Sequence, residues 1–541
     1  MSQTLYENGT ILTMETPTPV EALLTEDGII VKAGSLDEIH SLLQKDVAHR
    51  DLDGQTLMPA FIDPHSHFLG YANSLLQIPL DDAATFSDIV RLLEDGIRDR
   101  KIPKGEWVAA KGYDHNALAE GIHPTRELLD QAAPDHPVVL QHRSGHMGVF
   151  NSKALAMLGV DEHTPQIPGG LIQTRDGRCT GYMEENAYLH YLHQTPPPMP
   201  ESLLDAVQTA QEHYASYGIT TVQEGMMTDS MLPIYEHLTK QNLLKLDVVG
   251  YGDIRDCRAL TVTFALGSRK YTNHFRLGGF KIFLDGSPQG RTAWMRKPYE
   301  GDSSGYCGYP TLPDEAVQDH VNDALSRHVQ LLAHCNGDAA CAQYIRAFAR
   351  AKKNGADPGA IRPVMVHAQL LGLDQLEAVK NLGILPSFFP AHIYYWGDTH
   401  LKNFGPQRAA HISPAASAQK MGISYTFHQD APVLAPNMLE TIWCAVCRMT
   451  KSETLLGGDE RISVWDALKA ITINGAYQYF EEASKGTLSP GKKADLVILD
   501  RNPLTTPDAE LRNIQVMETI KEGQTIYQNP DASLLKEAYH G

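Results

Sequence analysis

Eight short apolar segments recur through the middle of the chain, and this recurrence constrains the fold more than any other feature. Their ranges are 57–63, 218–225, 245–252, 277–285, 330–336, 363–369, 383–389 and 422–428. Helical patterns separate most of them, for example over 313–328, 338–353 and 373–381. Strands that alternate with helices are typical of a parallel sheet, and eight is the strand number of a (β/α)8 barrel. We therefore expect an α/β fold, a TIM-like barrel spanning 58–485.

One connection is far longer than the others. Residues 64–217 separate the first two strand segments and hold strand signals of their own, at 106–114 and 136–143. A connection this long without secondary structure is uncommon in a compact domain. We interpret about 75–215 as an inserted α/β subdomain that follows the first strand and covers the active face of the barrel.

The two ends of the chain resemble each other in pattern. Residues 1–57 and 486–541 both read as short strands joined by turns, and neither end is long enough for a core of its own. Chain termini often lie close together in space. We expect the two ends to form one composite small β-domain.

Charge and composition exclude several classes of protein. The 541-residue chain has a formal charge of −19, which disfavours binding to nucleic acid or to an anionic membrane. Apolar runs end well before 18 residues, and the first residues lack the pattern of a signal peptide. Seven cysteines, an odd number, favour reduced thiols in a cytoplasm. The expected partner is a small-molecule substrate, with a homo-oligomer left open.

Two histidines follow the first strand segment in the sequence FIDPHSH. Residues two apart on extended backbone share a face, so His65 and His67 point the same way. Two imidazoles that converge at the end of a strand make half of a divalent-metal site. Ordinary surface or core histidines show the same spacing, so the pair alone does not establish a metal.

Lys281 lies inside an apolar strand, in the sequence FKIFLDG. Lysine is almost never buried without a partner. Either its ammonium meets a carboxylate such as Asp285, on the same face of the strand, or its charge is chemically changed. The residues alone leave both readings open, with the ion pair favoured.

Three more polar residues end apolar strands. His334 in LLAHCNGD, His367 in VMVHAQL and Asp430 in YTFHQDAPV lie at the carboxyl ends of the fifth, sixth and eighth segments. Active sites of TIM barrels are built at this end of the strands. Each residue has an ordinary structural explanation, but their gathering on one rim, with the earlier residues, favours a metal centre.

With these residues, the chain resembles the amidohydrolase superfamily, and within it amidohydrolase family 3. The resemblance covers nearly the whole chain. It includes MPAFIDPHSH, KGYDHNALAEGIHPTRELLD, PDHPVVLQHRSGH, FKIFLDGSPQGRTA, AHCNGDAA, VHAQL, DAPV and KGTLSPGKKADLVILD. It implies a barrel with a composite β-domain and one or two divalent metals, usually zinc. It also implies hydrolysis of C–N bonds other than peptide bonds, N-substituted formamides included.

The resemblance also assigns roles to single residues. The metal ligands that it implies are His65, His67, Lys281, His334, His367 and Asp430. Lys281 matches a lysine that is carboxylated in many relatives and bridges two metals, and Asp430 matches the catalytic aspartate. The chain departs from the pattern immediately before Asp430, where His428 and Gln429 replace the common Gly-Ser.

Four further residues are candidates near the rim. His146, in the RSGH sequence of the insertion, is the first candidate to bind substrate and stabilise an oxyanion, although a structural hydrogen bond explains it equally well. His392 either contacts substrate or packs under a loop. Glu185 and Glu224 are weaker candidates.

These observations predict a metal-dependent hydrolase in which Asp430 orients the attacking water, accepts its proton and passes it to the leaving nitrogen. The alternative within enzymes is an aminohydrolase that deaminates a ring amidine with a single metal. A non-catalytic barrel used as a scaffold is disfavoured, because all six ligand positions are intact.

Overall fold

The computed structural model describes residues 2–530, and in it the eight expected strands form one curled parallel sheet. The strands are β7 (Phe61–Ile62), β14 (Ile219–Met227), β15 (Asp247–Asp253), β16 (Phe275–Phe283), β17 (Gln330–Cys335), β18 (Val364–His367), β19 (Leu385–Phe388) and β20 (Thr426–Phe427). Every neighbouring pair is parallel and follows the order of the chain. The prediction of a barrel-type parallel sheet is confirmed.

The first strand differs from its expected extent. Residues 57–63 divide between two sheets, because β6 (Thr56–Pro59) pairs outside the barrel and only β7 joins it. The amide of Ala60 donates to the carbonyl of Asp495, whereas the next amide, that of Phe61, donates to Gly218. The chain therefore changes sheets at one residue, which an unbroken apolar run does not reveal.

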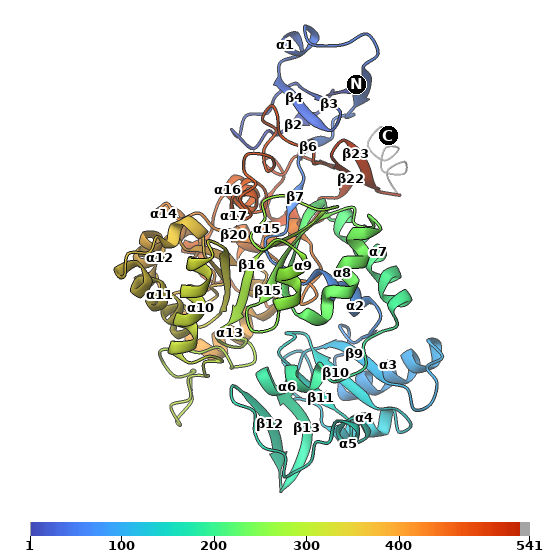
Figure 1. The fold of residues 1–541 in the computed structure, drawn as a ribbon, viewed down its shortest axis with the longest axis vertical. Coiled ribbons are helices and arrows are strands. Elements are labelled where there is room, and N and C mark those ends of the chain that lie inside the picture. The colour runs from blue at the N-terminus through green and yellow to red at the C-terminus, as the bar shows by residue number, and fades with distance from the viewer. Residues whose placement is uncertain (1, 531–541) are drawn as a thin grey trace.

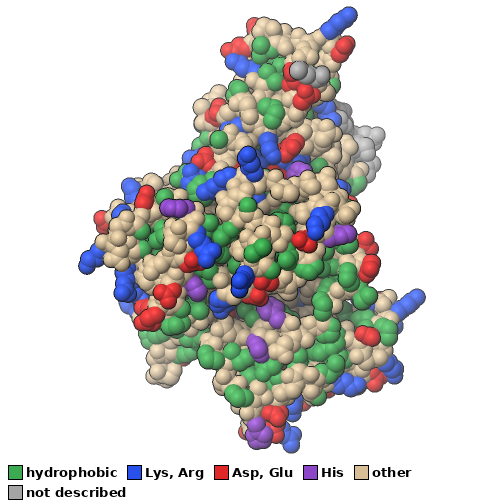
Figure 2. All heavy atoms as spheres, viewed as in Figure 1, with side chains coloured by type: hydrophobic (Ala, Val, Ile, Leu, Met, Phe, Trp, Pro, Cys, Tyr) green, Lys and Arg blue, Asp and Glu red, His purple; other side chains and the backbone are tan. Residues whose placement is uncertain are grey.

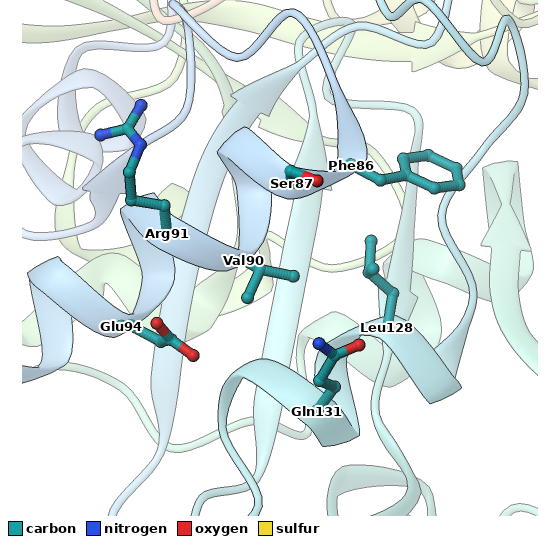
Figure 3. A pocket seen from close by; sticks show the side chains of 7 residues that line it. All are labelled: Phe86, Ser87, Val90, Arg91, Glu94, Leu128 and Gln131. Atoms are coloured by element: carbon teal, nitrogen blue, oxygen red, sulfur yellow. The ribbon is translucent and has the colours of Figure 1, made fainter.

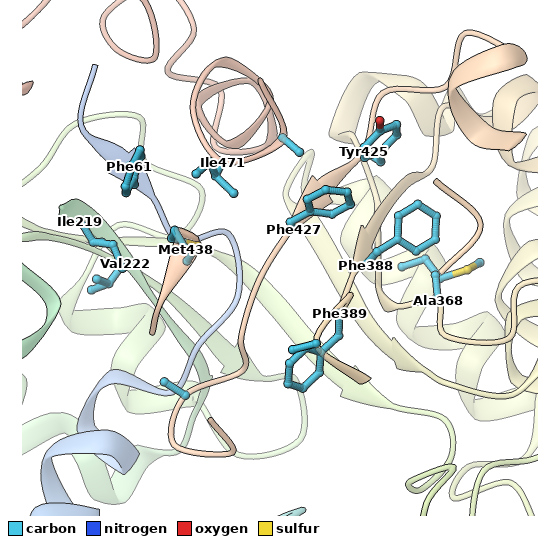
Figure 4. Packing of buried hydrophobic residues seen from close by; sticks show 14 of the residues in the cluster. Phe61, Ile219, Val222, Ala368, Phe388, Phe389, Tyr425, Phe427, Met438 and Ile471 are labelled. Carbon is cyan, nitrogen blue, oxygen red and sulfur yellow. The ribbon is translucent and has the colours of Figure 1, made fainter. Parts of the chain in front are cut away.

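Helices cover the outside of the barrel sheet and bury apolar stripes against it. In α11 (Asp338–Lys353), Ala340, Tyr344 and Phe348 recur every four residues and are all fully buried. Figure 4 shows aromatic residues of several strands packing together within the same core. The other helices of this part are α2 (Phe68–Leu75), α7 (Pro200–Ser216), α8 (Leu232–Lys240), α9 (Arg258–Thr263), α10 (Asp314–Ser326), α12 (Leu376–Leu382), α13 (His392–Ala409), α14 (Ala415–Lys420), α15 (Met438–Cys447), α16 (Val464–Ala470) and α17 (Ile473–Gln478).

The long connection after β7 forms a six-stranded sheet with its own helices and its own apolar clusters. Its strands are β8 (Ile78–Pro79), β9 (Val108–Tyr113), β10 (Val138–His142), β11 (Met147–Phe150), β12 (Gly170–Arg175) and β13 (Arg178–Glu184). Its helices are α3 (Phe86–Asp99), α4 (Arg126–Ala132), α5 (Ser152–Leu158) and α6 (Glu185–Leu192). A pocket between α3 and α4 is lined only by side chains of these two helices (Figure 3).

Strands from both ends of the chain pair with each other. A five-stranded sheet has the order β2-β6-β21-β22-β23, and β6 runs antiparallel to β21 with Leu57 opposite Ile498. The strands beyond β6 are β2 (Thr10–Ile11), β21 (Leu496–Leu499), β22 (Val516–Lys521) and β23 (Gln524–Gln528). A second sheet of β1 (Gln3–Glu7), β3 (Ala22–Glu26), β4 (Ile29–Gly34) and β5 (Ala48–Asp51) adjoins it, next to α1 (Leu36–His40). Residues 531–541 of the expected β-domain lie outside the described residues.

The terminal sheets and the insertion lie at opposite ends of the molecule, with the barrel between them (Figure 1). Acidic and basic side chains are interspersed over the face shown in Figure 2. Among residues 2–530, no helix combines the length and the apolar character that crossing a membrane requires.

Candidate active site

His65 is fixed with one ring nitrogen free to bind a ligand. It follows β7, is buried, and places Nδ1 2.6 Å from Oε1 of Gln223 on β14. Nε2 of Gln223 donates to the carbonyl of Pro64 at 2.7 Å, so its Oε1 must accept a hydrogen bond from the N–H of the imidazole. The neutral ring therefore carries its proton on Nδ1 and directs the lone pair of Nε2 toward Asp430.

His67 lies beside His65 at the start of α2. Its Nε2 is 3.6 Å from Oδ1 of Asp430, and its backbone amide donates to the carbonyl of Ala431. Glu224 accepts hydrogen bonds from the amide of Leu69 and the hydroxyl of Tyr235, and burial raises its pKa to about 7. Glu224 thus holds the first turn of α2. Among the described residues, its carboxyl group has no hydrogen bond to the side chain of a predicted ligand.

Asp430 is the centre of the group. Its Oδ1 is 3.2 Å from Nε2 of His65, and its Oδ2 is 3.8 Å from Nε2 of His367. Burial by itself raises the pKa of Asp430, but the surrounding histidines outweigh it and hold the pKa well below the usual value. The backbone has a φ of +54°, in a region where non-glycine residues are uncommon and often functional.

His334 and His367 end β17 and β18, as the sequence predicts. Nε2 of His367 lies 3.1 Å from Nδ1 of His334, and both rings are buried. One ligand atom from each of His65, His367 and Asp430 lies within 4.8 Å of the other two. His67 and His334 border this group of three, so five of the six predicted ligands surround one point.

Lys281, the sixth, is fully buried on β16. Its Nζ is 3.4 Å from Nε2 of His65, and burial lowers its pKa to about 8. The ion pair with Asp285 does not form: that carboxylate accepts instead from the amides of Trp294, Asn336 and Gly337. The structure therefore excludes Asp285 as the partner of Lys281, and Asp430 is the carboxylate that opposes the lowering of its pKa.

The insertion brings His146 to the barrel. Nδ1 of His146 is 2.8 Å from Oε2 of Glu185, whose other oxygen accepts from Thr292 at 2.7 Å. The ring centroid of His146 is 4.8 Å from that of His334. Burial lowers the pKa of His146, but Glu185, together with Asp430 and Asp285, outweighs burial and the net shift is upward.

His392 lies farther out, at the start of α13. Its Nδ1 is 3.0 Å from Nε2 of His400, and its ring contacts those of Phe389 and Trp396. Trp396 donates to Asp114 of the insertion at 2.7 Å. The ring of His392 thus packs against Phe389 and against its own helix, and among the described residues it has no hydrogen bond to a predicted ligand. Its contact with substrate stays a prediction.

The two departures before Asp430 behave differently. Gln429 donates to the carbonyl of Asn437 and so is held by the following loop. His428 is buried between the rings of His65 and His367, with centroid distances of 5.0 and 5.1 Å. Both positions depart from the common sequence, but only the side chain of His428 lies among the predicted metal ligands.

Comparison with known proteins is decisive for the family. A family model described as "Amidohydrolase family" matches residues 49–527. This chain belongs to the amidohydrolase family. The N-substituted formamide deformylase of Arthrobacter pascens is 26% identical, over 94% of this chain and 95% of the relative. The Bacillus subtilis protein YtcJ is 25% identical, over 97% and 99%. A metal-dependent hydrolase from Pyrococcus horikoshii has a TM-score of 0.75 at 26% identity, covering 94% of this chain and 99% of that structure.

The family resemblance and the class of reaction are thereby confirmed. This amidohydrolase is a hydrolase of carbon–nitrogen bonds, metal-dependent like its relatives, and its barrel is that of the family. Identities of 25–26% leave its substrate open.

Sequence reasoning missed two polar residues of the amidohydrolase site. Gln223 fixes His65, and Asn336 donates to Nε2 of His334 at 2.9 Å while holding the carbonyl of Gly286. Asn336 was within reach of sequence reasoning, because it stands two residues after His334. Gln223 carries no such signal, because its partner is 158 residues away.

Proposed function

We propose that this amidohydrolase binds one or two zinc ions through His65, His67, Lys281, His334, His367 and Asp430. The observation that carries the proposal is the buried group of His65, His367 and Asp430, whose ligand atoms converge within 4.8 Å. Neutral imidazoles and a carboxylate are donors that suit zinc. Burial lowers the pKa of each histidine of the set, which keeps the rings neutral and able to bind.

When bound, the metal supplies Lewis acidity and activates water at neutral pH. Asp430, at the centre of the imidazoles, orients the attacking water and accepts its proton. The same carboxyl group then gives the proton to the leaving nitrogen, since an amine leaves poorly as an anion. His146, held by Glu185 beside His334, donates a hydrogen bond to the developing oxyanion.

The proposed substrates are N-formyl or other N-acyl amines, and His146 and His392 are proposed to contact them. Similarity to an N-substituted formamide deformylase supports this class. The alternative is a single-metal aminohydrolase acting on a ring amidine. It is favoured by two observations. The amine of Lys281 lies 3.4 Å from Nε2 of His65, and the predicted ligands form a single converging group of three among the described residues.

A panel of N-formyl, N-acetyl and carbamoyl amines, assayed for release of free amine, tests the substrate class. We expect turnover of at least one N-acyl amine by the zinc-loaded protein and none by Asp430→Asn with its zinc retained. Release of ammonia from a ring amidine, with no release from the panel, would favour the aminohydrolase.

Two further proposals concern the whole chain. We propose that residues 1–57 and 486–541 form one β-domain, with 58–485 as the barrel and about 75–215 as its insertion; pairing of β6 with β21 supports this. We also propose a cytoplasmic location, because all seven cysteines are free and six of them are buried.

A further inference from the structure

His428 is a buried histidine without hydrogen-bond partners. It follows β20, its side chain is 0% exposed, and neither Nδ1 nor Nε2 makes a hydrogen bond. A buried polar group left without a partner costs about 1–3 kcal/mol. Such a group in a folded protein calls for an explanation, and a bound ion is one of the few that apply.

The position of the ring indicates which ligand it takes. The rings of His65, His367 and His428 form a nearly equilateral triangle, with centroid distances of 5.0, 5.1 and 5.5 Å. Three imidazoles that each bind a tetrahedral zinc through one nitrogen, at about 2.1 Å, have centroids about 5 Å apart. The triangle therefore has the dimensions of a three-imidazole metal site.

The surroundings of His428 suit this role. The backbone of Ser387 on β19 lies near the ring without reaching hydrogen-bond geometry. A histidine that binds a metal through one nitrogen commonly directs its other N–H to a backbone carbonyl. Phe389 packs against the ring on another side, with a centroid distance of 5.0 Å, while His65 and His367 adjoin it at 5.0 and 5.1 Å.

We propose that His428 is an additional ligand of the metal centre and binds the same ion as His65 and His367. This inference rests on the proposed zinc centre and changes its composition. Asp430 lies 3.2 Å from His65 and 3.8 Å from His367, so it borders the same ion. Three neutral imidazoles are sufficient to hold a catalytic zinc, which frees the Asp430 carboxyl group for proton transfer.

The test compares metal binding by the full-length protein with that of His428→Phe, which keeps an aromatic ring and removes both nitrogens. We expect zinc affinity, measured by competition with a chelator, to fall about 100-fold or more, since even residues behind the ligands change it about 10–100-fold. X-ray absorption of the zinc-loaded protein should lose one imidazole scatterer. The cobalt(II) absorption spectrum should change in intensity.

His400→Phe is the matched control. His400 is equally buried, but its ring stacks on His392 instead of the ligands. We expect wild-type zinc affinity and an unchanged cobalt(II) spectrum. Unfolding temperatures of the metal-free variants exclude misfolding as the cause of a difference.

Two outcomes overturn the inference and are distinguishable. If His428→Phe binds zinc as tightly as the wild type, with the same cobalt(II) spectrum, His428 is not a ligand and the proposed function stands. If the wild-type protein binds no zinc, the centre itself is absent and both proposals fail.

Discussion

Gln223 accepts a hydrogen bond from Nδ1 of His65 at 2.6 Å, and this contact sets which nitrogen of the histidine faces Asp430. The amide cannot turn over without losing its second bond, to the carbonyl of Pro64. Residues that fix the tautomer of a ligand in this way commonly tune metal affinity.

We expect Gln223→Leu to weaken zinc binding by about 10–100-fold, because His65 loses the acceptor that fixes its tautomer. Chelator competition measures the effect. Gln343→Leu is the control, since Gln343 is also buried but bonds to Leu312 and Asp314 outside the centre. Equal zinc affinity in the two variants would show that Gln223 only packs.

The protein should lose its metal only at a pH well below the ordinary pKa of a histidine side chain. Burial lowers the pKa of His67 to about 3 and lowers those of His65, His334 and His367 as well. A lowered pKa means that the neutral, metal-binding form persists below pH 6.5. We expect zinc content after dialysis to be the same at pH 8 and pH 6 and to fall by pH 4. Half-loss near pH 6.5 would contradict this.

Most of the barrel was predictable because each strand is a continuous apolar run that ends in a polar residue. His334 and His367 could be placed on the rim for this reason alone. The division of the first strand at Ala60 could not be predicted, because it depends on which sheet each backbone amide joins. The local sequence pattern thus specifies where strands form, but not where the chain passes from one sheet to another.

The chemistry of the site was predictable only where it depends on residue type. Lys281 could be singled out as a buried lysine, but the loss of its partner could not, since Asp285 is satisfied by backbone amides of two folded loops. Gln223 and His65 meet only through the pairing of β14 with β7. Such contacts require the register of strands that are distant in sequence.

His146 should affect turnover and leave the metal in place. Its imidazole is held by Glu185 and stands beside His334, where it is proposed to meet the oxyanion. We expect His146→Ala to lower kcat about 100–1,000-fold with unchanged zinc content. The control is His163→Ala, an exposed residue of the same insertion. Loss of zinc together with activity would make His146 part of the metal site instead.

The C-terminal segment should be indispensable for folding. Asp247 on β15 is fully buried and binds Lys521 at 2.8 Å, and β21 fills the place beside β6. Removing one partner of a buried ion pair costs about 3–5 kcal/mol. We expect deletion of 486–541 to give insoluble protein, and Lys521→Met to lower the unfolding temperature. Deletion of 531–541 is the control. A soluble, active protein lacking 486–541 would refute the composite domain.

The last prediction is that Lys281 becomes carboxylated and bridges two metal ions. An ammonium about 4 Å from a metal cation is repelled by about 4 kcal/mol or more at an effective dielectric near 20. Burial lowers the pKa of Lys281 to about 8, so the neutral amine that reacts with carbon dioxide is accessible near neutral pH. The product is an anionic ligand, placed beside His65 and able to span the roughly 3.5–4 Å of a two-metal site.

Protein loaded with zinc in ¹³C-labelled bicarbonate decides the question. We expect a carbamate carbon signal and two zinc ions per chain, and Lys281→Met should lose the signal and at least one ion. Lys485→Met is the control, because Lys485 is an equally buried lysine whose ammonium is already neutralised by Asp247 at 2.6 Å and which therefore has no reason to react. One zinc per chain and no carbamate in the wild type would reject the bridge. That result would leave Lys281 as a neutral amine beside a single ion, the arrangement that the aminohydrolase alternative requires.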